Sequence, residues 1–542
     1  MDQLALFFAL LLAALLMVPL GDRTGLPAPV LMTVFGGFLA LLPFTPEVSV
    51  PPEFILPLVL PPLLYAAVQR TSWRQFAANK RPILLLAVAL VFVNTAVVAA
   101  VTHTMLPGLG LAAAVALGAL VAPPDPIAAT AVAGRLGLPR RLVSILEGEG
   151  LFNDVTAITL YHVAIGAAVT GAFSLPRAAG ALVLSAVVAV VVGFGLGWTA
   201  SRIMGMLGDP TLQTGLTLLV PFASYVLAEE LMGSGVLAVL VTALYLSSSR
   251  VADPDDVQGR LAGRTFWSVI ETLVTGIAFG LIGLELDVVF NAVRQEWRWL
   301  LPTALAVVAV IVLVRLLWLL PAAWLAGRLH RDRDLDEDIP VSWRETVVVW
   351  WAGMRGVATV ALALAVPLHV EAEAGGGGFP ERDAILFVAF AVVLATLVCQ
   401  GLTLPWVVRR LEVRTDSAAE RELERQLALR CAKAARRRLR EIEEVQELPD
   451  EVLDVLERRA WEVGARICPD LADEERRETQ AQRTERARTV WKLQAELLSA
   501  ARHEVLAARG EPGTDPQVVD RVLHQLDVRS VRVWGRPSGE RD

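Results

Sequence analysis

The sequence has little charge and few cysteines for a chain of its length. Only 19% of its 542 residues are charged, whereas 55% are hydrophobic, a combination that is rare in a soluble domain. Its three cysteines, Cys399, Cys431 and Cys468, show neither CxxC nor metal-ligand spacing, which argues against a disulfide framework. Lysine is almost absent, with three residues against 46 arginines, as is typical of GC-rich bacterial genomes. We expect no cofactor and no nucleic-acid partner.

The apolar residues gather in the first three quarters of the chain. Up to about residue 410, apolar runs of about twenty residues follow one another, each long enough to cross about 30 Å of hydrocarbon as a helix. The first run, Leu4 to Leu20, lacks a basic region before it, so it is interpreted as a retained span rather than a cleaved signal. The sequence therefore predicts an all-α polytopic membrane domain over 1–411 and a helical cytoplasmic tail over 412–542.

The breaks between the apolar runs predict thirteen transmembrane helices. These cover about residues 4–21, 26–43, 52–69, 82–102, 108–134, 142–171, 175–201, 211–229, 234–249, 265–289, 299–327, 345–369 and 381–409. One set of alternate loops contains sixteen Lys and Arg residues and the other set contains four. Because cytoplasmic loops are enriched in these residues, we expect the N-terminus outside and the tail inside, in a bacterial inner (cell) membrane.

Two of the predicted spans are interrupted. The fifth contains "VAPPDPIAAT", whose three clustered prolines an unbroken helix would not tolerate. Asp125 followed by Pro126 predicts an N-cap with proline at the first helical position, so a new half-helix is expected to begin there. The twelfth contains "WWAGMRGVATVALALAVP", where Arg355 stands between two glycines. The interruptions hold the fifth place in spans 1–6 and in spans 8–13.

This arrangement predicts two inverted six-helix repeats with crossed discontinuous helices. At 1.5 Å per residue, Asp125 lies about 15 Å from the cytoplasmic end of its span, Arg355 about 16 Å from Arg344, and Asp154 about 20 Å beyond Arg141. Three ionisable groups from distant segments are thus expected at one depth. Paired interrupted helices indicate a transporter's binding site near the bilayer midplane.

The stretch "EGEGLFNDVTAITLY" at 147–161 places acids in a membrane span. Buried charges are costly in a bilayer and normally pair or mark an ion path. Glu149 and Asn153 share a helix face, whereas Asp154 is turned by about 100°. We expect Glu149, Asn153 and Arg355 to form a buried structural cluster, which leaves Asp154 without a fixed cationic partner. Because burial favours the neutral form of a carboxylate, Asp154 is predicted to bind either a proton or a small cation.

A dehydrated cation such as Na⁺ needs several hard oxygen ligands. The candidates are Asp154, the hydroxyl of Thr156, water, and carbonyl groups freed at the break around Ala122–Pro124, that of Pro124 in particular. A single acid at the site, with Asn153 beside it, favours one cation per proton and an electroneutral exchange.

Several motifs together resemble the monovalent cation:proton antiporters of the NHE/NhaP type. "EGEGLFNDVTAITLY" resembles their E-S-L-L-N-D helix, "PPDPIAA" their T-D-P-V-A crossing segment, and "WAGMRGVATVALALAVP" their G-x-R-G-x-x-(S/A)-x-A-L-A-x-P segment. "LVCQGLTLPWVVRRL" at 397–411 and "GLIGLEL" at 280–286 are also similar to family segments. The order and spacing agree over about residues 4–411, and the tail lies outside the resemblance.

The resemblance implies roles for particular residues. Asp154 matches the acid that binds the ion and the proton, Asn153 matches its partner, Glu149 the acid that pairs with Arg355, and Asp125 the aspartate of the crossing segment. It also implies thirteen spans, a homodimer, and a core bundle that moves against a dimerisation domain. Two positions depart from the pattern, since Pro124 replaces the usual Thr and Gly150 the usual Ser.

Structural interpretations stand beside the functional ones. Asp154 could be a buried structural acid, and Asp125 a helix cap or part of the site. His162 could be a proton relay or a packed side chain. Arg315 could pair with an acid such as Glu271 or contact lipid headgroups. Glu229 and Glu230 could form a solvated rim or a vestibule that attracts cations. The tail is either a small solvated helical domain or a module that regulates or stabilises a dimer.

The sequence thus predicts a secondary transporter rather than an enzyme, an antiporter of Na⁺ or K⁺ (or Li⁺) against H⁺. A K⁺-preferring antiporter of the same fold is the nearest alternative. A transport-inactive membrane sensor that signals through the tail is a third, against which the buried charges of Asp154 and Arg355 speak.

Overall fold

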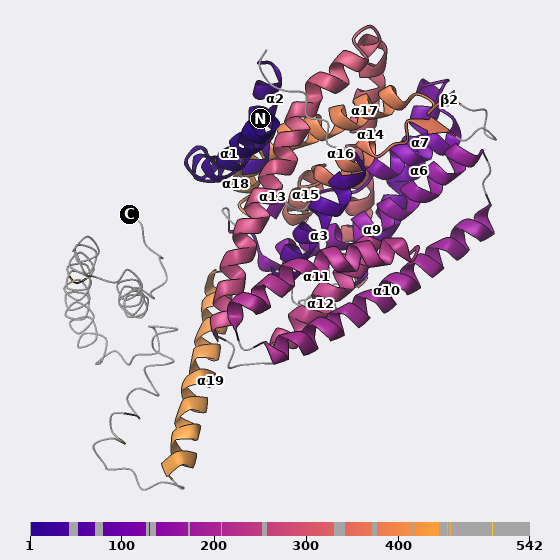
Figure 1. Cartoon of the computed structure of the whole chain (residues 1–542). Coiled ribbons are helices and arrows are strands. Elements are labelled where there is room, and N and C mark those ends of the chain that lie inside the picture. The colour runs from indigo at the N-terminus through magenta and orange to yellow at the C-terminus, as the bar shows by residue number, and fades with distance from the viewer. Residues whose placement is uncertain are drawn as a thin grey trace. The chain divides into compact units, whose positions relative to one another are not determined.

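The chain forms two units, Met1–Thr415 and Asp416–Asp542. The computed structural model describes residues 2–42, 52–70, 80–125, 129–130, 137–171, 174–207, 209–251, 257–329, 342–370, 377–413 and 417–443, with the single positions 453, 456 and 501. Helices make up nearly all of the described part of the first unit (Figure 1). The predicted all-α membrane fold is therefore confirmed.

Helical segments occupy all thirteen of the predicted ranges. Their bounds are α1 Asp2–Thr24, α2 Ala28–Ala40, α3 Pro52–Arg70, α5 Lys80–Leu84, η1 Leu85–Ala89, α6 Leu90–Met105, α7 Leu111–Val121, α9 Arg140–Thr170, α10 Leu175–Met206, α11 Pro210–Glu230, α12 Gly235–Val251, α13 Val257–Ala292, α14 Trp297–Leu329, α15 Trp343–Trp351, α16 Val357–Leu364, α17 Arg382–Ala395, η3 Thr396–Gln400 and α18 Gly401–Leu411. Among the described residues, eight helices are long and apolar enough to cross a membrane, and four apolar helices are shorter. The count of thirteen crossings stays a prediction.

Local sequence signals mark where some of these helices begin. α15 starts with a capping box, in which the Ser342 hydroxyl accepts a hydrogen bond from the Glu345 N–H at 3.2 Å and the Glu345 carboxylate accepts one from the Ser342 N–H at 3.3 Å. α11 starts at Pro210, and the Asp209 carboxylate before it accepts a hydrogen bond from the Thr211 N–H at 2.8 Å.

The predicted interruption of the twelfth span is confirmed. α15 ends at Trp351 and α16 begins at Val357, with the glycine-containing segment 352–356 between them. In the fifth span, α7 ends at Val121. The half-helix expected to begin at Pro126 falls largely outside the described residues. A short antiparallel strand pair, β1 His369–Val370 with β2 Gly377–Gly378, was not predicted and follows α16.

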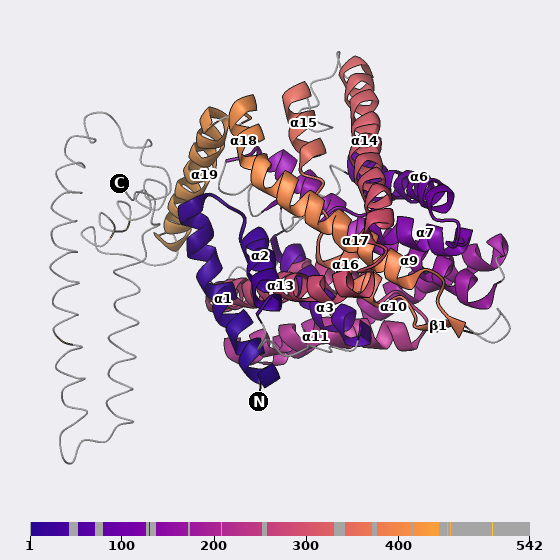
Figure 2. The same cartoon turned by 90° about the horizontal axis from the view of Figure 1, so that it is seen from above.

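Two of the spans contain a π-helical turn that the sequence analysis did not predict. η1 separates α5 from α6, and η3 separates α17 from α18 within one continuous rod (Figure 2). A π-turn inside an α-helix shifts the hydrogen-bond register and often occurs beside a functional site. η3 lies next to the break in the twelfth span, because the Thr396 hydroxyl accepts a hydrogen bond from the Arg355 N–H at 3.1 Å.

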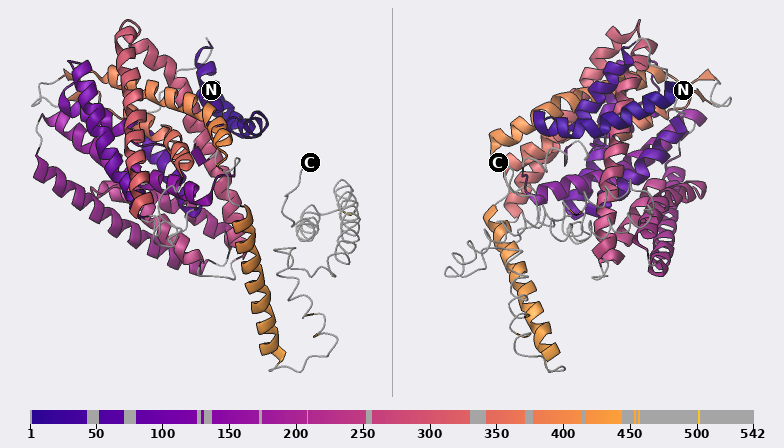
Figure 3. Two further views of the ribbon diagram at one scale, coloured as in Figure 1. Left: turned by 180° about the vertical axis from the view of Figure 1, so that it is seen from behind. Right: turned by 60° about the vertical axis from the view of Figure 1, so that its left-hand side comes forward.

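The helices of the first unit pack as two groups. One group contains α1, α2, α3, α10, α11, α12 and α13, in which α2 packs along α13 and α10 along α12 (Figures 1 and 3). The other contains α6, α7, α9, α14, α16 and α17. Contacts of α3 with α16 and of α13 with α17 join the groups. In the second unit, α19, Ser417–Glu443, is a charged amphipathic helix as the sequence predicted for this stretch.

Candidate functional site

The two interrupted segments meet at their breaks, in the interior of the first unit. The Asp125 N–H donates a hydrogen bond to the Met354 carbonyl at 2.6 Å. Each segment leaves carbonyl or N–H groups without partners of its own helix. The crossing therefore brings together helix ends whose polar backbone groups need partners from other elements, which accounts for the buried polar side chains gathered around it.

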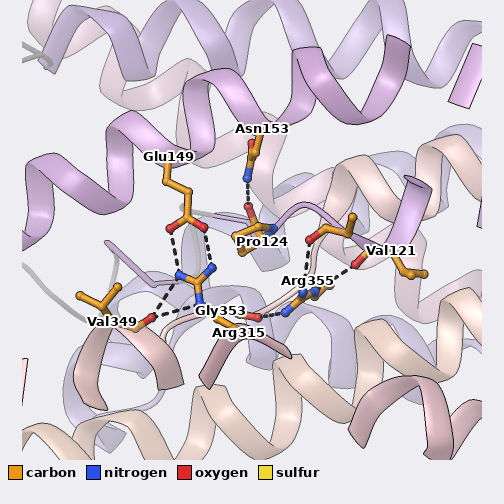
Figure 4. Close-up of polar contacts among 9 residues, drawn as sticks. Val121, Pro124, Glu149, Asn153, Arg315, Val349, Gly353 and Arg355 are labelled. Carbon is orange, nitrogen blue, oxygen red and sulfur yellow. Dashed lines mark hydrogen bonds and ion pairs between the residues drawn. The ribbon is translucent and has the colours of Figure 1, made fainter. Parts of the chain in front are cut away.

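Arg355 supplies several of these partners. Its side chain is 1% exposed, and its guanidinium donates to the carbonyls of Val121 at 3.1 Å and Ala122 at 3.2 Å, and to that of Gly353 (Figure 4). These carbonyls belong to the ends of α7 and α15, where the helix dipoles are negative. Arg355 thus binds the C-terminal ends of two helices at once and holds the crossing together.

The partner of Glu149 is Arg315 on α14. The two side chains form a bidentate ion pair with distances of 2.5 and 2.9 Å, and Arg315 also donates to the Val349 carbonyl at 3.1 and 3.3 Å (Figure 4). Both side chains are almost completely buried. The predicted pairing of Glu149 with Arg355 is wrong, because the guanidinium of Arg355 is taken up by backbone carbonyls. Of the two interpretations of Arg315, pairing with an acid is the correct one, but the acid is Glu149 rather than Glu271.

Asn153 connects α9 to the first break rather than to the charge cluster. Its Nδ2 donates to the Pro124 carbonyl at 2.8 Å (Figure 4), and the side chain is 0% exposed. Its Oδ1 has no hydrogen-bond partner in the part of the chain that the structure describes. Glu149, Asn153 and Arg355 therefore do not form the expected cluster, because each of the three side chains has its own separate partners.

Asp125 caps the opposite interrupted helix. Its Oδ2 accepts a hydrogen bond from the Val357 N–H at 3.2 Å, at the first residue of α16. Gly356 lies so close that a Cβ atom built there would contact the Asp125 carboxylate. A carboxylate at a helix N-terminus is stabilised by the unpaired N–H groups and by the helix dipole. The cap predicted for Asp125 is found, but on α16; the predicted cap on the half-helix beginning at Pro126 lies outside the described residues.

Asp154, which is half-buried, lines a partly open cavity of about 60 Å³. α9 contributes Asp154, and the first break contributes Pro124 and Asp125. The rest of the wall comes from α3, α13, the first turn of α16 and Thr130. Among the described residues, Asp154 has no hydrogen bond or ion pair. Besides Asp125 and Asp154, the wall contains two further acids, Glu147 and Glu271. The described acids, histidines and cysteines nevertheless form no group of three or more that could hold a metal ion.

Thr156 lies elsewhere. Its hydroxyl donates to the Phe152 carbonyl of its own helix at 3.1 Å, and its side chain lines a second cavity of about 210 Å³ together with Thr159, Ser185 and Ser234. The prediction that Thr156 is a ligand beside Asp154 is wrong, because two residues along a helix turn a side chain by about 200°.

The remaining candidates lie away from this cavity. His162 is exposed and its ring lies 5.7 Å from that of Tyr161, and it is not part of the wall around Asp154. The Glu229 carboxylate accepts a hydrogen bond from the Gly235 N–H at 2.8 Å, so it closes the turn between α11 and α12. Glu230 is exposed. These contacts favour the structural interpretations.

The site combines one carboxylate without a partner with fixed charges that have partners. Arg315 with Glu149, and Arg355 with the helix ends, are held by short contacts and close packing. Among the described residues, Asp154 can change its bound species without breaking an ion pair or a hydrogen bond, so the arrangement is suited to bind and release a proton or a monovalent cation.

Comparisons with known proteins agree with this geometry. Residues 8–410 match the family model described as sodium/hydrogen exchanger, transmembrane. A protein named as an uncharacterized Na(+)/H(+) exchanger of Mycobacterium tuberculosis is 32% identical over 539 residues, which cover 98% of this chain and 96% of the relative. A sodium, potassium, lithium and rubidium/H(+) antiporter of Bacillus subtilis is 31% identical over 395 residues, covering 70% of this chain and 57% of the relative.

The fold also has a solved counterpart. The sodium proton antiporter MjNhaP1 from Methanocaldococcus jannaschii, solved at pH 8, matches with a TM-score of 0.58 and 19% identity, covering 76% of this chain and 99% of that one. The match over residues 8–410, more than half of the chain, confirms the resemblance seen in the motifs, and with it the chain belongs to the sodium/hydrogen exchanger family.

Proposed function

We propose that the protein is an antiporter that exchanges a monovalent cation for H⁺ across the membrane, with Asp154 as the group that binds either one. The single observation that carries this proposal is a carboxylate in a cavity that has no ion-pair or hydrogen-bond partner among the described residues, beside the fixed charges of Glu149, Arg315 and Arg355. An acid of this kind is costly in a membrane protein unless it has a function.

Exclusive binding at one carboxylate leads to exchange. If Asp154 holds a proton or a cation but not both, and the cavity changes its side of access only when occupied, each cation that leaves is replaced by a proton. The wall around Asp154 contains residues of both helix groups, from α3 and α13 on one side and from α9 and α16 on the other. A movement of one group against the other would open and close this cavity, which is the simplest form of alternating access.

The coupling is proposed to be one cation for one proton. Asn153, which is neutral, stands beside Asp154, and the acid nearest in sequence, Glu149, is neutralised by Arg315. A single titrating group in each cycle moves no net charge. Na⁺ is the first candidate cation, and relatives named as antiporters of sodium, potassium, lithium and rubidium keep a K⁺-preferring antiporter of the same fold as the second.

The arrangement in the cell follows from the charge distribution. We place the protein in the bacterial inner membrane as a homodimer, with its N-terminus outside and its tail in the cytoplasm, since sixteen of twenty loop Lys and Arg residues lie on the side assigned to the cytoplasm. The tail is proposed to regulate transport or to stabilise the dimer.

A dequenching assay of the pH gradient in everted vesicles tests the function. Wild-type protein is expected to dissipate the gradient on addition of Na⁺, K⁺ or Li⁺. Asp154→Asn is expected to lose this response, since an amide side chain does not take up or release a proton in the pH range of the assay. Glu230→Gln, which removes an exposed acid, is the matched control and should behave as wild type. Wild-type exchange by Asp154→Asn would refute the assigned role, and no response of the wild type to any of the three cations would favour the sensor.

Electroneutral coupling has its own test in proteoliposomes. With Na⁺ as the transported cation, a membrane potential is imposed with valinomycin. The Na⁺ gradient at which net proton movement stops is then expected to stay unchanged. A shift of this balance point with the potential would show that more than one proton moves for each cation.

A further inference from the structure

Thr359, a threonine whose hydroxyl has no partner among the described residues, lines the cavity around Asp154. Thr359 is the third residue of α16, is 1% exposed, and lines that cavity. Its Oγ1 has no hydrogen-bond partner among the residues that the structure describes. A buried hydroxyl that makes no hydrogen bond costs free energy, so its position calls for a partner that binds within the cavity.

Several other threonines in these helices satisfy their hydroxyls locally, whereas the hydroxyls of Thr95 and Thr275 also have no partner among the described residues. Thr33, Thr159 and Thr396 each donate to the carbonyl four residues before, at 3.0, 2.7 and 2.8 Å, which is the usual behaviour of a helical threonine. The residue four before Thr359 is Arg355, which lies in the break rather than in a helical turn. Thr359 therefore has no preceding turn of α16 to offer the carbonyl that Thr33, Thr159 and Thr396 use.

The rest of the wall near Asp154 offers few neutral oxygens. Pro124, Gly150 and Leu151 have no polar side-chain atom, and the Pro124 carbonyl already accepts the Asn153 amide. A small cation without its full water shell requires several oxygen ligands, and a hydroxyl oxygen is a suitable one. Two threonines carry hydroxyls in this wall, Thr130 after the first break and Thr359 on α16, and of these Thr359 is the one whose hydroxyl is buried without a partner among the described residues.

We propose that Thr359 Oγ1 is a direct ligand of the transported cation, together with the Asp154 carboxylate and water. This inference rests on the proposed function of Asp154. Cation binding then joins α9 to the first turn of α16, the helix whose N-terminus Asp125 caps. The proton needs only Asp154, so Thr359 affects the cation and leaves the affinity for H⁺ unchanged.

Thr359→Val and Thr359→Ser in everted vesicles test this role, with Na⁺, K⁺ and Li⁺ each titrated at one alkaline pH. Valine keeps the shape but removes the oxygen, and we expect its half-saturating cation concentration to rise about 10- to 150-fold, the range for one lost contact to a charge. The maximal rate at saturating cation is expected to be retained. Serine keeps the oxygen and should stay within about threefold of wild type.

Thermal unfolding in detergent separates a ligand from a structural residue. Because a methyl group replaces a hydroxyl without a partner, Thr359→Val should unfold at the same temperature as wild type or higher without cation, and should lose most of the stabilisation that Na⁺ gives to the wild type. A purely structural role would lower the unfolding temperature and leave the shift with Na⁺ intact. Thr359→Ala serves as a second variant if Thr359→Val is not recovered from the membrane.

Thr156→Val is the matched control. Its side chain lines the second cavity rather than the one around Asp154, and its hydroxyl already donates to the Phe152 carbonyl. The half-saturating cation concentration of this variant should therefore equal that of wild type. Unchanged cation affinity in Thr359→Val, with exchange by wild type and none by Asp154→Asn, would overturn the inference and leave the proposed function standing. Failure of wild type to exchange or to be stabilised by any of the three cations would overturn both.

Discussion

At the scale of single residues, two buried arginines balance their charge in different ways. Arg315 forms a bidentate ion pair with Glu149, whereas Arg355 binds the carbonyls at the ends of two helices. Both are 1% exposed. A buried positive charge that is stabilised only by carbonyl dipoles requires the two helix ends to keep their positions. The guanidinium of Arg355 is therefore stable only while the helices cross, and it stabilises that crossing in turn.

The ion pair of Glu149 and Arg315 predicts a strongly non-additive mutant cycle. Glu149→Gln and Arg315→Met each leave one buried charge without its partner, and each should destabilise the protein by about 3–5 kcal/mol. The double variant removes both charges and should recover at least half of that loss. Thermal unfolding of the four proteins in detergent measures the coupling. Losses that simply add in the double variant would contradict the pairing.

At the scale of elements, glycine allows α2 and α13 to approach each other closely. A Cβ atom at Gly36 would contact the Gly280 carbonyl, and one at Gly283 would contact the Thr33 carbonyl. The sequence "GIAFG" at 276–280 is a small-xxx-small pattern of the kind that brings membrane helices together. Since α13 also contributes Glu271 to the wall around Asp154, this packing positions one side of the cavity.

Gly36→Ala is therefore expected to destabilise the protein by about 1–3 kcal/mol, the usual cost of overpacking, although alanine is the better helix former. The control is Gly215→Ala in α11, where a Cβ atom would meet no other atom within 4 Å, and it should be neutral or slightly stabilising. Detergent unfolding temperatures compare the two. Equal stability of Gly36→Ala and wild type would show that α2 and α13 can separate without cost.

At the scale of the whole molecule, the two helix groups meet at the cavity that contains Asp154. α9 and α16 belong to one group and α3 and α13 to the other. Proposed movement between the groups would change which side of the membrane reaches Asp154, while Arg355 and the Glu149–Arg315 pair keep the interrupted helices together within their own group.

Competition between proton and cation predicts a definite pH dependence. Protons occupy Asp154 more as pH falls, so the half-saturating cation concentration should rise, by up to about tenfold for each pH unit lowered, while the maximal rate at saturating cation changes little. Initial rates in vesicles with equal pH on both sides provide the measurement. A half-saturating concentration that stays constant while the maximal rate alone changes would contradict binding of both ions to one group.

Sequence patterns predicted the positions of the helical segments and part of the candidate site. Apolar runs predicted the helical segments, and the glycines around Arg355 predicted the break between α15 and α16. The helix "EGEGLFND" placed Asp154 on a different face from Glu149 and Asn153, and these three side chains have separate surroundings in the structure. These predictions succeeded because periodicity depends only on the residues of one segment.

Other features were not predicted from the sequence. The hydroxyl of Thr359 was not predicted as part of the site, although its place four residues after Arg355, just beyond a break, could have indicated a missing acceptor. The π-turn η3 was missed as well, because its sequence, "TLVCQ", is as compatible with an α-helix.

The sequence by itself determined that this is a helical membrane protein with two interrupted spans, an acid at their depth and the motifs of its family, because these depend on composition and on spacing along one segment. Only the tertiary structure decided that Glu149 pairs with Arg315, 166 residues away, that Asp125 caps α16, and that Thr359 rather than Thr156 shares the cavity with Asp154. Each of these depends on which side chains meet when distant helices pack, and buried charges and hydroxyls take the partner that packing brings within reach.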